Sequence, residues 1–225
     1  HLSVPAGSAL DVSAMAGGLV LGTGQKLSGN RTIVGNVTVN AGATLSAGAS
    51  VGLLTLAGNL TLNGGTNSVE ISELTNDVVN VTGNLTLSGV STINLTLLAS
   101  LPVGTYPLIK YAGTISGSVA NLQLAGYPLS RLSAALSHNV GSKSIDLVIS
   151  GTSGALVWQG GLNGNAWDVA STTNWLNGGS PDYFLNGDGV TFNDAGAANN
   201  GVNLVGALSA GPVAVNAVAD YTFGG

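Results

Sequence analysis

The feature that most constrains this chain is a five-residue phrase that occurs three times, starting 23 and then 25 residues apart. The copies are Gly35-Asn-Val-Thr-Val39, Gly58-Asn-Leu-Thr-Leu62 and Gly83-Asn-Leu-Thr-Leu87. Recurrence at a period of about 20–50 residues is typical of repeat architectures, in which each unit buries its apolar side against the next. In each phrase two apolar residues flank a threonine, which is the alternation of a strand with one buried face. The phrase therefore predicts a parallel β-helix in which Val37, Leu60 and Leu85 stack inside.

The remainder of residues 1–100 contains short alternating segments bounded by Gly, Asn and Ala-Gly corners, which also read as strands. Short strands at this spacing are equally typical of an antiparallel sandwich. The repeated phrase and the scarcity of Asn-Gly and Asp-Gly hairpin turns in this region favour the β-helix.

The pattern changes after about residue 101. Two alternating segments flank Asn139–Lys143 and predict an antiparallel hairpin near residues 129–149. We therefore expect residues 1–150 to form a β-solenoid that includes this hairpin. Residues 156–225 contain all three tryptophans and half of the acidic residues, and they predict a second β-rich module.

Composition excludes several classes of protein. Only 7% of the residues are charged, against roughly 25% in an ordinary soluble domain. The five Lys and Arg residues are isolated from one another, so the sequence predicts no nucleic-acid binding, which needs clustered cations. The apolar stretches are far shorter than the ~20 residues of a membrane-spanning helix. A hydrophobic share of 44% excludes disorder, and the lack of cysteine excludes disulfides and thiolate zinc sites.

Asp182, Asp188 and Asp194 are the candidate metal ligands, because they offer carboxylates for a structural calcium ion. Their spacing does not match a calcium-binding loop of twelve residues. Acidic turn residues that hydrogen-bond their own backbone are the alternative interpretation. With only His1 and His138 present, no histidine-based metal site and no other cofactor is expected.

Trp158, Trp167 and Trp175 are nine and eight residues apart and are the candidate ligand-binding residues. They read either as the core of a wider module or as a platform on which sugar rings stack. The Asn-x-Thr triplets inside the repeated phrase suit a corner asparagine and an outward threonine. We expect the asparagines to form hydrogen-bonded ladders between repeats.

An enzymatic interpretation rests on carboxylate pairs. Glu70 and Glu73 are three apart on a predicted strand, so they point to opposite faces. Glu70 with Asp77 or Asp146 could serve as acid and base in a polysaccharide-degrading β-helix. Grooves that act on acidic polymers need basic residues or calcium, and charges are sparse here. The sequence therefore predicts no catalytic residues.

Several runs in order along the chain resemble the autotransporter-associated β-strand repeat family of large bacterial surface proteins. They are Leu10–Ala14, Gly24–Gly29, Val34–Val39, Gly42–Ser46, Gly48–Gly52, Leu54–Leu62, Asp77–Gly89 and Trp158–Phe192. The resemblance implies a right-handed parallel β-helix, secretion, and a passenger or stalk role at the cell surface, with no shared catalytic residues. Residues from Trp158 onward resemble the start of a further repeat unit, so we expect either an excerpt or one unit of a longer fibre.

These observations favour an extracellular structural protein, a β-solenoid segment of a bacterial surface fibre, filament or stalk. Neither end of the sequence contains a polar cap, so we expect other copies or adjacent repeats to cover the solenoid ends. The alternatives are a carbohydrate-binding or adhesin module that uses the tryptophans or the solenoid groove, and a polysaccharide-degrading enzyme.

Overall fold

The computed structural model describes residues 2–3, 9–48 and 50–225. It divides into two compact units. The first unit comprises His1–Ala99, Gly104–Tyr127 and Ala134–Val148, and the second comprises Ser100–Val103, Pro128–Ser133 and Ile149–Gly225. Nearly all regular structure in the described residues is β-strand.

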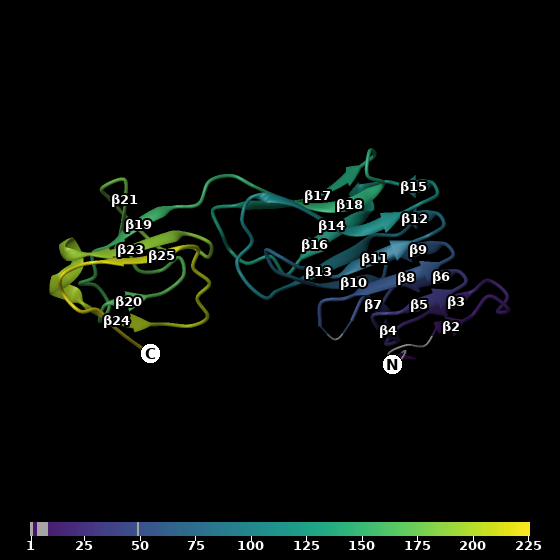
Figure 1. Cartoon of the computed structure of the whole chain (residues 1–225), viewed down its shortest axis with the longest axis horizontal. Coiled ribbons are helices and arrows are strands. Elements are labelled where there is room, and N and C mark those ends of the chain that lie inside the picture. Colours follow the sequence, from purple (N-terminus) through teal and green to yellow (C-terminus); the bar gives the residue numbers. More distant parts are fainter. Residues whose placement is uncertain (1, 4–8, 49) are drawn as a thin grey trace. The chain divides into compact units, whose positions relative to one another are not determined.

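The described residues of the first unit form three sheets, and the chain visits them in turn (Figure 1). Sheet 1 contains, in order, β1 (Leu2–Ser3), β4 (Lys26–Ser28), β7 (Thr44–Ser46), β10 (Thr66–Ile71), β13 (Ser91–Leu97) and β16 (Leu122–Ala125). Sheet 2 contains β2 (Ala9–Asp11), β5 (Thr32–Val34), β8 (Leu53–Ala57), β11 (Val78–Val81), β14 (Gly104–Tyr111), β18 (Ser144–Ser150) and β17 (Ser133–Asn139). Sheet 3 contains β3 (Leu19–Leu21), β6 (Val37–Asn40), β9 (Leu60–Asn63), β12 (Leu85–Leu87) and β15 (Ile115–Gly117). A 3-10 helix, η1 (Val119–Asn121), precedes β16.

Strands of successive repeats pair in parallel and in register. Val37 is the partner of Leu60 and Leu60 is the partner of Leu85, so the stacking predicted from the phrase is confirmed. Their side chains are 0–1% exposed, and they form part of the core of the unit. The pairing is that of a parallel repeat, and the antiparallel sandwich considered from the sequence is wrong for these strands.

Sheet 2 ends differently from the other two. β17 and β18 follow one another around the turn at residues 140–143 and are neighbours in the sheet. The amide of Tyr111, at the end of β14, donates to the carbonyl of Lys143, which immediately precedes β18. Because the end of one strand meets the beginning of the other, β14 and β18 run in opposite directions. The parallel order of sheet 2 therefore stops at β14.

Asn67 interrupts the apolar interior of sheet 1. Its register partners are Leu45 on one side and Ile93 on the other, both fully buried. The Asn67 side chain is 1% exposed, and neither its Oδ1 nor its Nδ2 has a hydrogen-bond partner among the residues that the structure describes. This residue occupies a core position with a polar group that nothing compensates.

The second unit contains two sheets. One has the order β22 (Ser180–Asp182), β21 (Trp175–Asn177), β19 (Ala155–Trp158), β23 (Gly189–Asn193) and β25 (Val213–Asn216). The other has the order β20 (Ala166–Trp167), β24 (Gly201–Leu204) and β26 (Thr222–Gly224), and a 3-10 helix η2 (Asp194–Asn199) lies between β23 and β24. From β23 to β26 the chain alternates between the sheets and adds parallel strands.

Residues 100–103 and 128–133 belong to the second unit, although the sequence predicted that they form part of the β-solenoid of residues 1–150. Hydrogen bonds link both segments to later residues of that unit. The Ser100 hydroxyl donates to the Ala210 carbonyl at 3.0 Å, and the Ser130 hydroxyl donates to the Asn186 carbonyl at 2.8 Å. The boundary expected near residue 150 is therefore crossed by two earlier segments.

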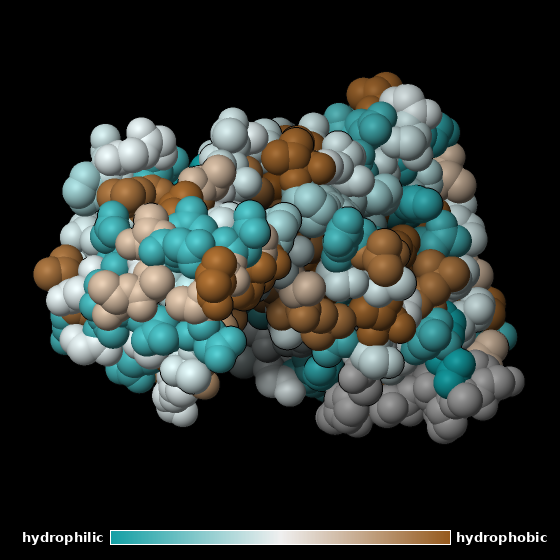
Figure 2. All heavy atoms as spheres, turned by 60° about the vertical axis from the view of Figure 1, so that its left-hand side comes forward, coloured by the Kyte–Doolittle hydropathy of each residue, from teal (hydrophilic) through white to brown (hydrophobic). Residues whose placement is uncertain are grey.

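Hydrophobic residues are interspersed among hydrophilic ones on the face shown in Figure 2. The predicted uncapped N-terminal end falls largely on residues 1 and 4–8, which lie outside the described residues.

Candidate functional site

The corners that precede the strands of sheet 3 explain why the phrase begins with glycine. A Cβ atom added at Gly83 would lie 2.7 Å from the Gly58 carbonyl oxygen of the preceding repeat, and one at Gly113 would lie 2.9 Å from the Gly83 carbonyl oxygen. Real Cβ atoms do not approach backbone oxygens so closely. The Gly83 amide donates to the Gly58 carbonyl at 3.0 Å. Glycine thus lets the backbones of successive repeats touch.

The asparagine after each glycine binds the next repeat. The Oδ1 atom of Asn36 accepts from the amide of Asn59 at 3.0 Å, and Oδ1 of Asn59 accepts from the amide of Asn84 at 2.8 Å. Oδ1 of Asn84 accepts in turn from the amide and the hydroxyl of Thr114. The predicted asparagine ladder is confirmed, with a side chain bonded to backbone at each step.

Threonines form a second row on the outer face of sheet 3. Thr38, Thr61 and Thr86 are register partners in β6, β9 and β12, and they alternate with the buried apolar residues. Val20 in β3 and Ser116 in β15 occupy the same position in the flanking repeats. The hydroxyl of Ser116 donates to that of Thr86 at 3.1 Å.

The two rows line one groove, which we call the Asn-Thr groove. It has a volume of about 240 Å³ and is lined by Gly17, Asn36, Val37, Thr38, Asn59, Thr61, Asn84 and Thr86. None of these lining residues is charged. The groove therefore offers amide and hydroxyl groups to a ligand without an electrostatic preference for either sign.

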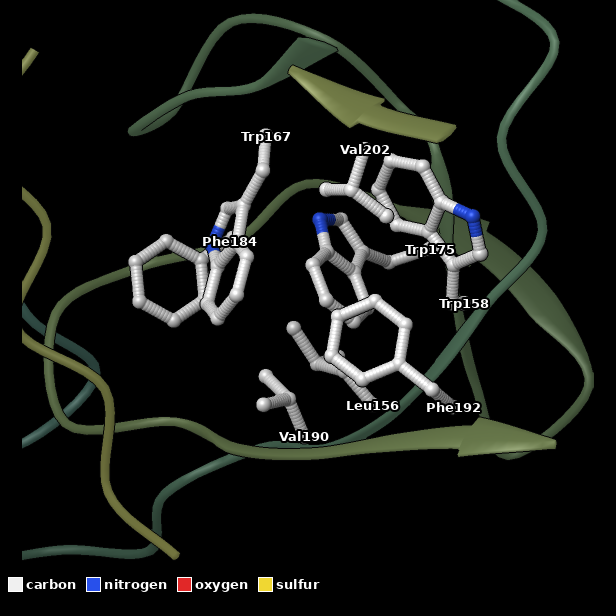
Figure 3. Close-up of a cluster of buried hydrophobic side chains, with 8 residues drawn as sticks. All are labelled: Leu156, Trp158, Trp167, Trp175, Phe184, Val190, Phe192 and Val202. Carbon is white, nitrogen blue, oxygen red and sulfur yellow. The ribbon is translucent and has the colours of Figure 1, made fainter. Parts of the chain in front are cut away.

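The three tryptophans lie in the core of the second unit (Figure 3). Trp158 and Trp175 are fully buried and Trp167 is 6% exposed. Trp175 contacts Trp158 and Trp167 edge-to-face, with ring centroids 4.9 and 5.2 Å apart, and Phe192 packs against all three. The core interpretation therefore describes these residues. The carbohydrate platform considered as its alternative is not present, because the ring faces are covered by other aromatic rings.

Two of the candidate calcium ligands bind an arginine. Nε of Arg131 donates to both carboxylate oxygens of Asp188 at 3.0 Å, and its NH2 group donates to Oδ2 of Asp182 at 2.9 Å. Asp188 is fully buried and also accepts from the amides of Gly154 and Leu185. The Arg131 guanidinium thus provides the positive charge between these carboxylates that a calcium ion would otherwise supply.

The electrostatics of Asp182 follow from the same contacts. Partial burial pushes its pKa upward, but hydrogen bonds from Asn177, from the Tyr183 amide and from Arg131 outweigh this effect. The net result is a pKa below the usual value for an aspartate. Sequence reasoning did not identify Arg131 as the partner, because its distance of 51 residues from Asp182 hides the contact.

Asp194, the third candidate, lies at the start of η2 and accepts from the amide of Val218 at 2.7 Å. Within the part of the chain that the structure describes, no three His, Asp or Glu side chains gather where they could share a metal ion.

Two of the carboxylates considered for catalysis, Asp77 and Asp146, are buried and accept hydrogen bonds. Asp77 is 2% exposed and accepts from the amides of Gly52 at 2.7 Å and Glu70 at 3.0 Å. Burial raises the pKa of Asp77; the two amide hydrogen bonds oppose this rise, and the nearby Glu70 carboxylate adds to it. Asp146 is also buried, and its Oδ2 accepts from the side chain of Asn139. Asp77 directly precedes β11, and its carboxylate accepts from one amide in β10 and from one amide just before β8. It therefore links these three segments by hydrogen bonds.

Among the described residues, neither helix is long and apolar enough to cross a membrane. No family model, no curated protein and no solved structure matches this chain. The similarity to the autotransporter-associated β-strand repeat family therefore rests on the residues named from the sequence alone.

Proposed function

We propose that this chain is a structural segment of a right-handed parallel β-helix in a bacterial surface fibre, filament or stalk, without catalytic activity. The observation that carries the proposal is that four of the five positions of the repeated phrase serve the stacking of repeats. Glycine allows backbone contact, asparagine accepts the next amide, and the apolar pair fills the core. A right-handed path is supported by the strong preference of connections between parallel strands for that hand. Secretion and a surface location are inferred from the sequence resemblance.

The edge strands of the second unit support a role in assembly. β25 and β26 are the last strands of their sheets, and all their described residues are exposed. Val213 is 55% and Val215 is 56% exposed. An uncovered edge with apolar side chains is a template for another strand. We infer that parallel strands of an adjacent repeat or of another copy continue these sheets.

The test is the state of association of the purified chain. The proposal predicts concentration-dependent oligomers or short filaments, measured by light scattering and negative-stain electron microscopy. A Val213→Lys, Val215→Lys double variant should remain monomeric, because charged side chains on an edge strand oppose its pairing with another strand. Leu74→Lys is the matched control, since Leu74 is 88% exposed in a turn of the first unit. A wild-type chain that stays a monodisperse monomer at every concentration would refute the assembly role.

A further inference from the structure

We propose that the Asn-Thr groove binds an uncharged polysaccharide that lies along the direction in which the repeats stack. This inference is separate from the proposed assembly, since it concerns the outer face of sheet 3 and no sheet edge of the second unit. It rests on the hydrogen-bonding state of the groove residues, on their periodic arrangement and on their lack of charge.

The asparagine side chains hold donors ready for a ligand. Because Oδ1 of Asn36 and of Asn59 accepts a backbone amide, the orientation of each side-chain amide is fixed. The Nδ2 groups of Asn36, Asn59 and Asn84 have no acceptor among the described residues, and these side chains are exposed. Each group therefore presents two N–H donors whose ordering was achieved on folding, and this lowers the entropy cost of binding.

The row of threonines adds hydroxyl groups beside these amides. A hydroxyl both donates and accepts, so Thr38, Thr61 and Thr86 can match ligand hydroxyls in either orientation. Sugar hydroxyls have the same dual character. A ligand rich in hydroxyl groups therefore satisfies both rows of the groove.

The periodicity indicates a polymer. Parallel strands are about 4.8 Å apart, so the same pair of side chains recurs at that interval in β6, β9 and β12. A ligand with one hydroxyl-bearing unit after another can engage several repeats at once. Individually weak contacts then add through multivalency.

The absence of charge among the lining residues selects the kind of polymer. Nucleic acids and acidic polysaccharides bind through cations that neutralise their anionic groups, and the groove residues supply none. The lining residues include no aromatic side chain, and the exposed groups are amides and hydroxyls, so an apolar partner gains little here.

Native affinity electrophoresis tests the proposal with four uncharged probes, hydroxyethyl cellulose, glucomannan, dextran and pullulan, and with alginate as the acidic probe. We expect at least one uncharged polymer to retard the wild-type chain and alginate to leave its mobility unchanged. A Thr38→Val, Thr61→Val, Thr86→Val variant should bind about tenfold more weakly or worse, as the loss of several hydrogen bonds requires. Val20 already occupies this ladder position in β3, so valine suits the strand.

The matched control is Thr44→Val, Thr66→Val, Thr92→Val, which changes the outward threonine row of sheet 1 over the same number of repeats. It should bind like the wild type. Asn59→Asp is a second variant: it keeps an oxygen acceptor for the Asn84 amide and removes the Nδ2 donor, so binding should weaken without loss of the fold. The proposal is overturned if no uncharged polymer retards the chain, if alginate retards it most strongly, or if both triple variants behave alike.

Discussion

Asn67 provides the sharpest test of how the core of the first unit is built. It lies between Leu45 and Ile93, is 1% exposed, and has two polar atoms without partners in the described part of the chain. A buried polar group that lacks a hydrogen bond costs about 1–3 kcal/mol. Leucine has the same branching as asparagine and exposes no polar atom, so it continues the apolar ladder. We expect Asn67→Leu to raise the free energy of unfolding by about 1–3 kcal/mol.

Two companion variants separate the polar cost from packing. Asn67→Ala removes the same polar atoms but leaves a void, and large-to-small changes in cores cost about 2–5 kcal/mol. It should therefore be less stable than Asn67→Leu. Asn67→Val guards against overpacking by leucine, because valine is smaller and favours strands.

Urea unfolding followed by circular dichroism measures these differences in unfolding free energy. In thermal unfolding, each kcal/mol should move Tm by about 2–4 °C for a chain of this size. Hydrogen exchange of the β10 amides assigns the change to the first unit. If both Asn67→Leu and Asn67→Val unfold at lower urea than the wild type, then Asn67 has a stabilising partner and our account of this site is wrong.

Three further predictions concern other contacts. Gly83→Ala should lower the unfolding free energy by about 1–3 kcal/mol through overpacking. Gly22→Ala is the control: its Cβ would meet its nearest atom at 3.9 Å, so the unfolding free energy should change by less than about 1 kcal/mol. Equal effects of the two variants in urea unfolding would contradict the close-contact argument. Arg131→Leu leaves the buried Asp188 without its cation and should destabilise the second unit by about 3–5 kcal/mol, measured by tryptophan fluorescence in urea; a loss below about 1 kcal/mol would show that the pair is dispensable. Asp77 has a raised pKa in the folded state, so its ionisation opposes folding, and its contribution to the free energy of unfolding should fall as pH rises from the unfolded-state value of 3.8 through the folded-state pKa. The difference in unfolding free energy between wild type and Asp77→Asn, measured across this pH range, should show that dependence. A difference that does not change with pH would disprove it.

The sequence was sufficient to predict the repeating strands of sheet 3. In the phrase, local alternation and the recurrence of identical residues carry the same information as the three-dimensional register, because like residues stack on like in a parallel repeat. Val37, Leu60 and Leu85 therefore pair as predicted. The asparagine ladder was predictable for the same reason, although the sequence did not specify that the partner of each side chain is a backbone amide.

Contacts between residues that share no repeat were decided only by the tertiary structure. The salt bridges from Arg131 to Asp182 and Asp188, the enclosure of the three tryptophans by one another and by Phe192, and the unsatisfied Asn67 depend on which distant segments meet. Periodicity in a sequence reports the face on which a residue lies, but it does not report the atoms opposite that face. The sequence thus determined the stacking of the repeats, and the folded chain determined which polar and aromatic groups have partners.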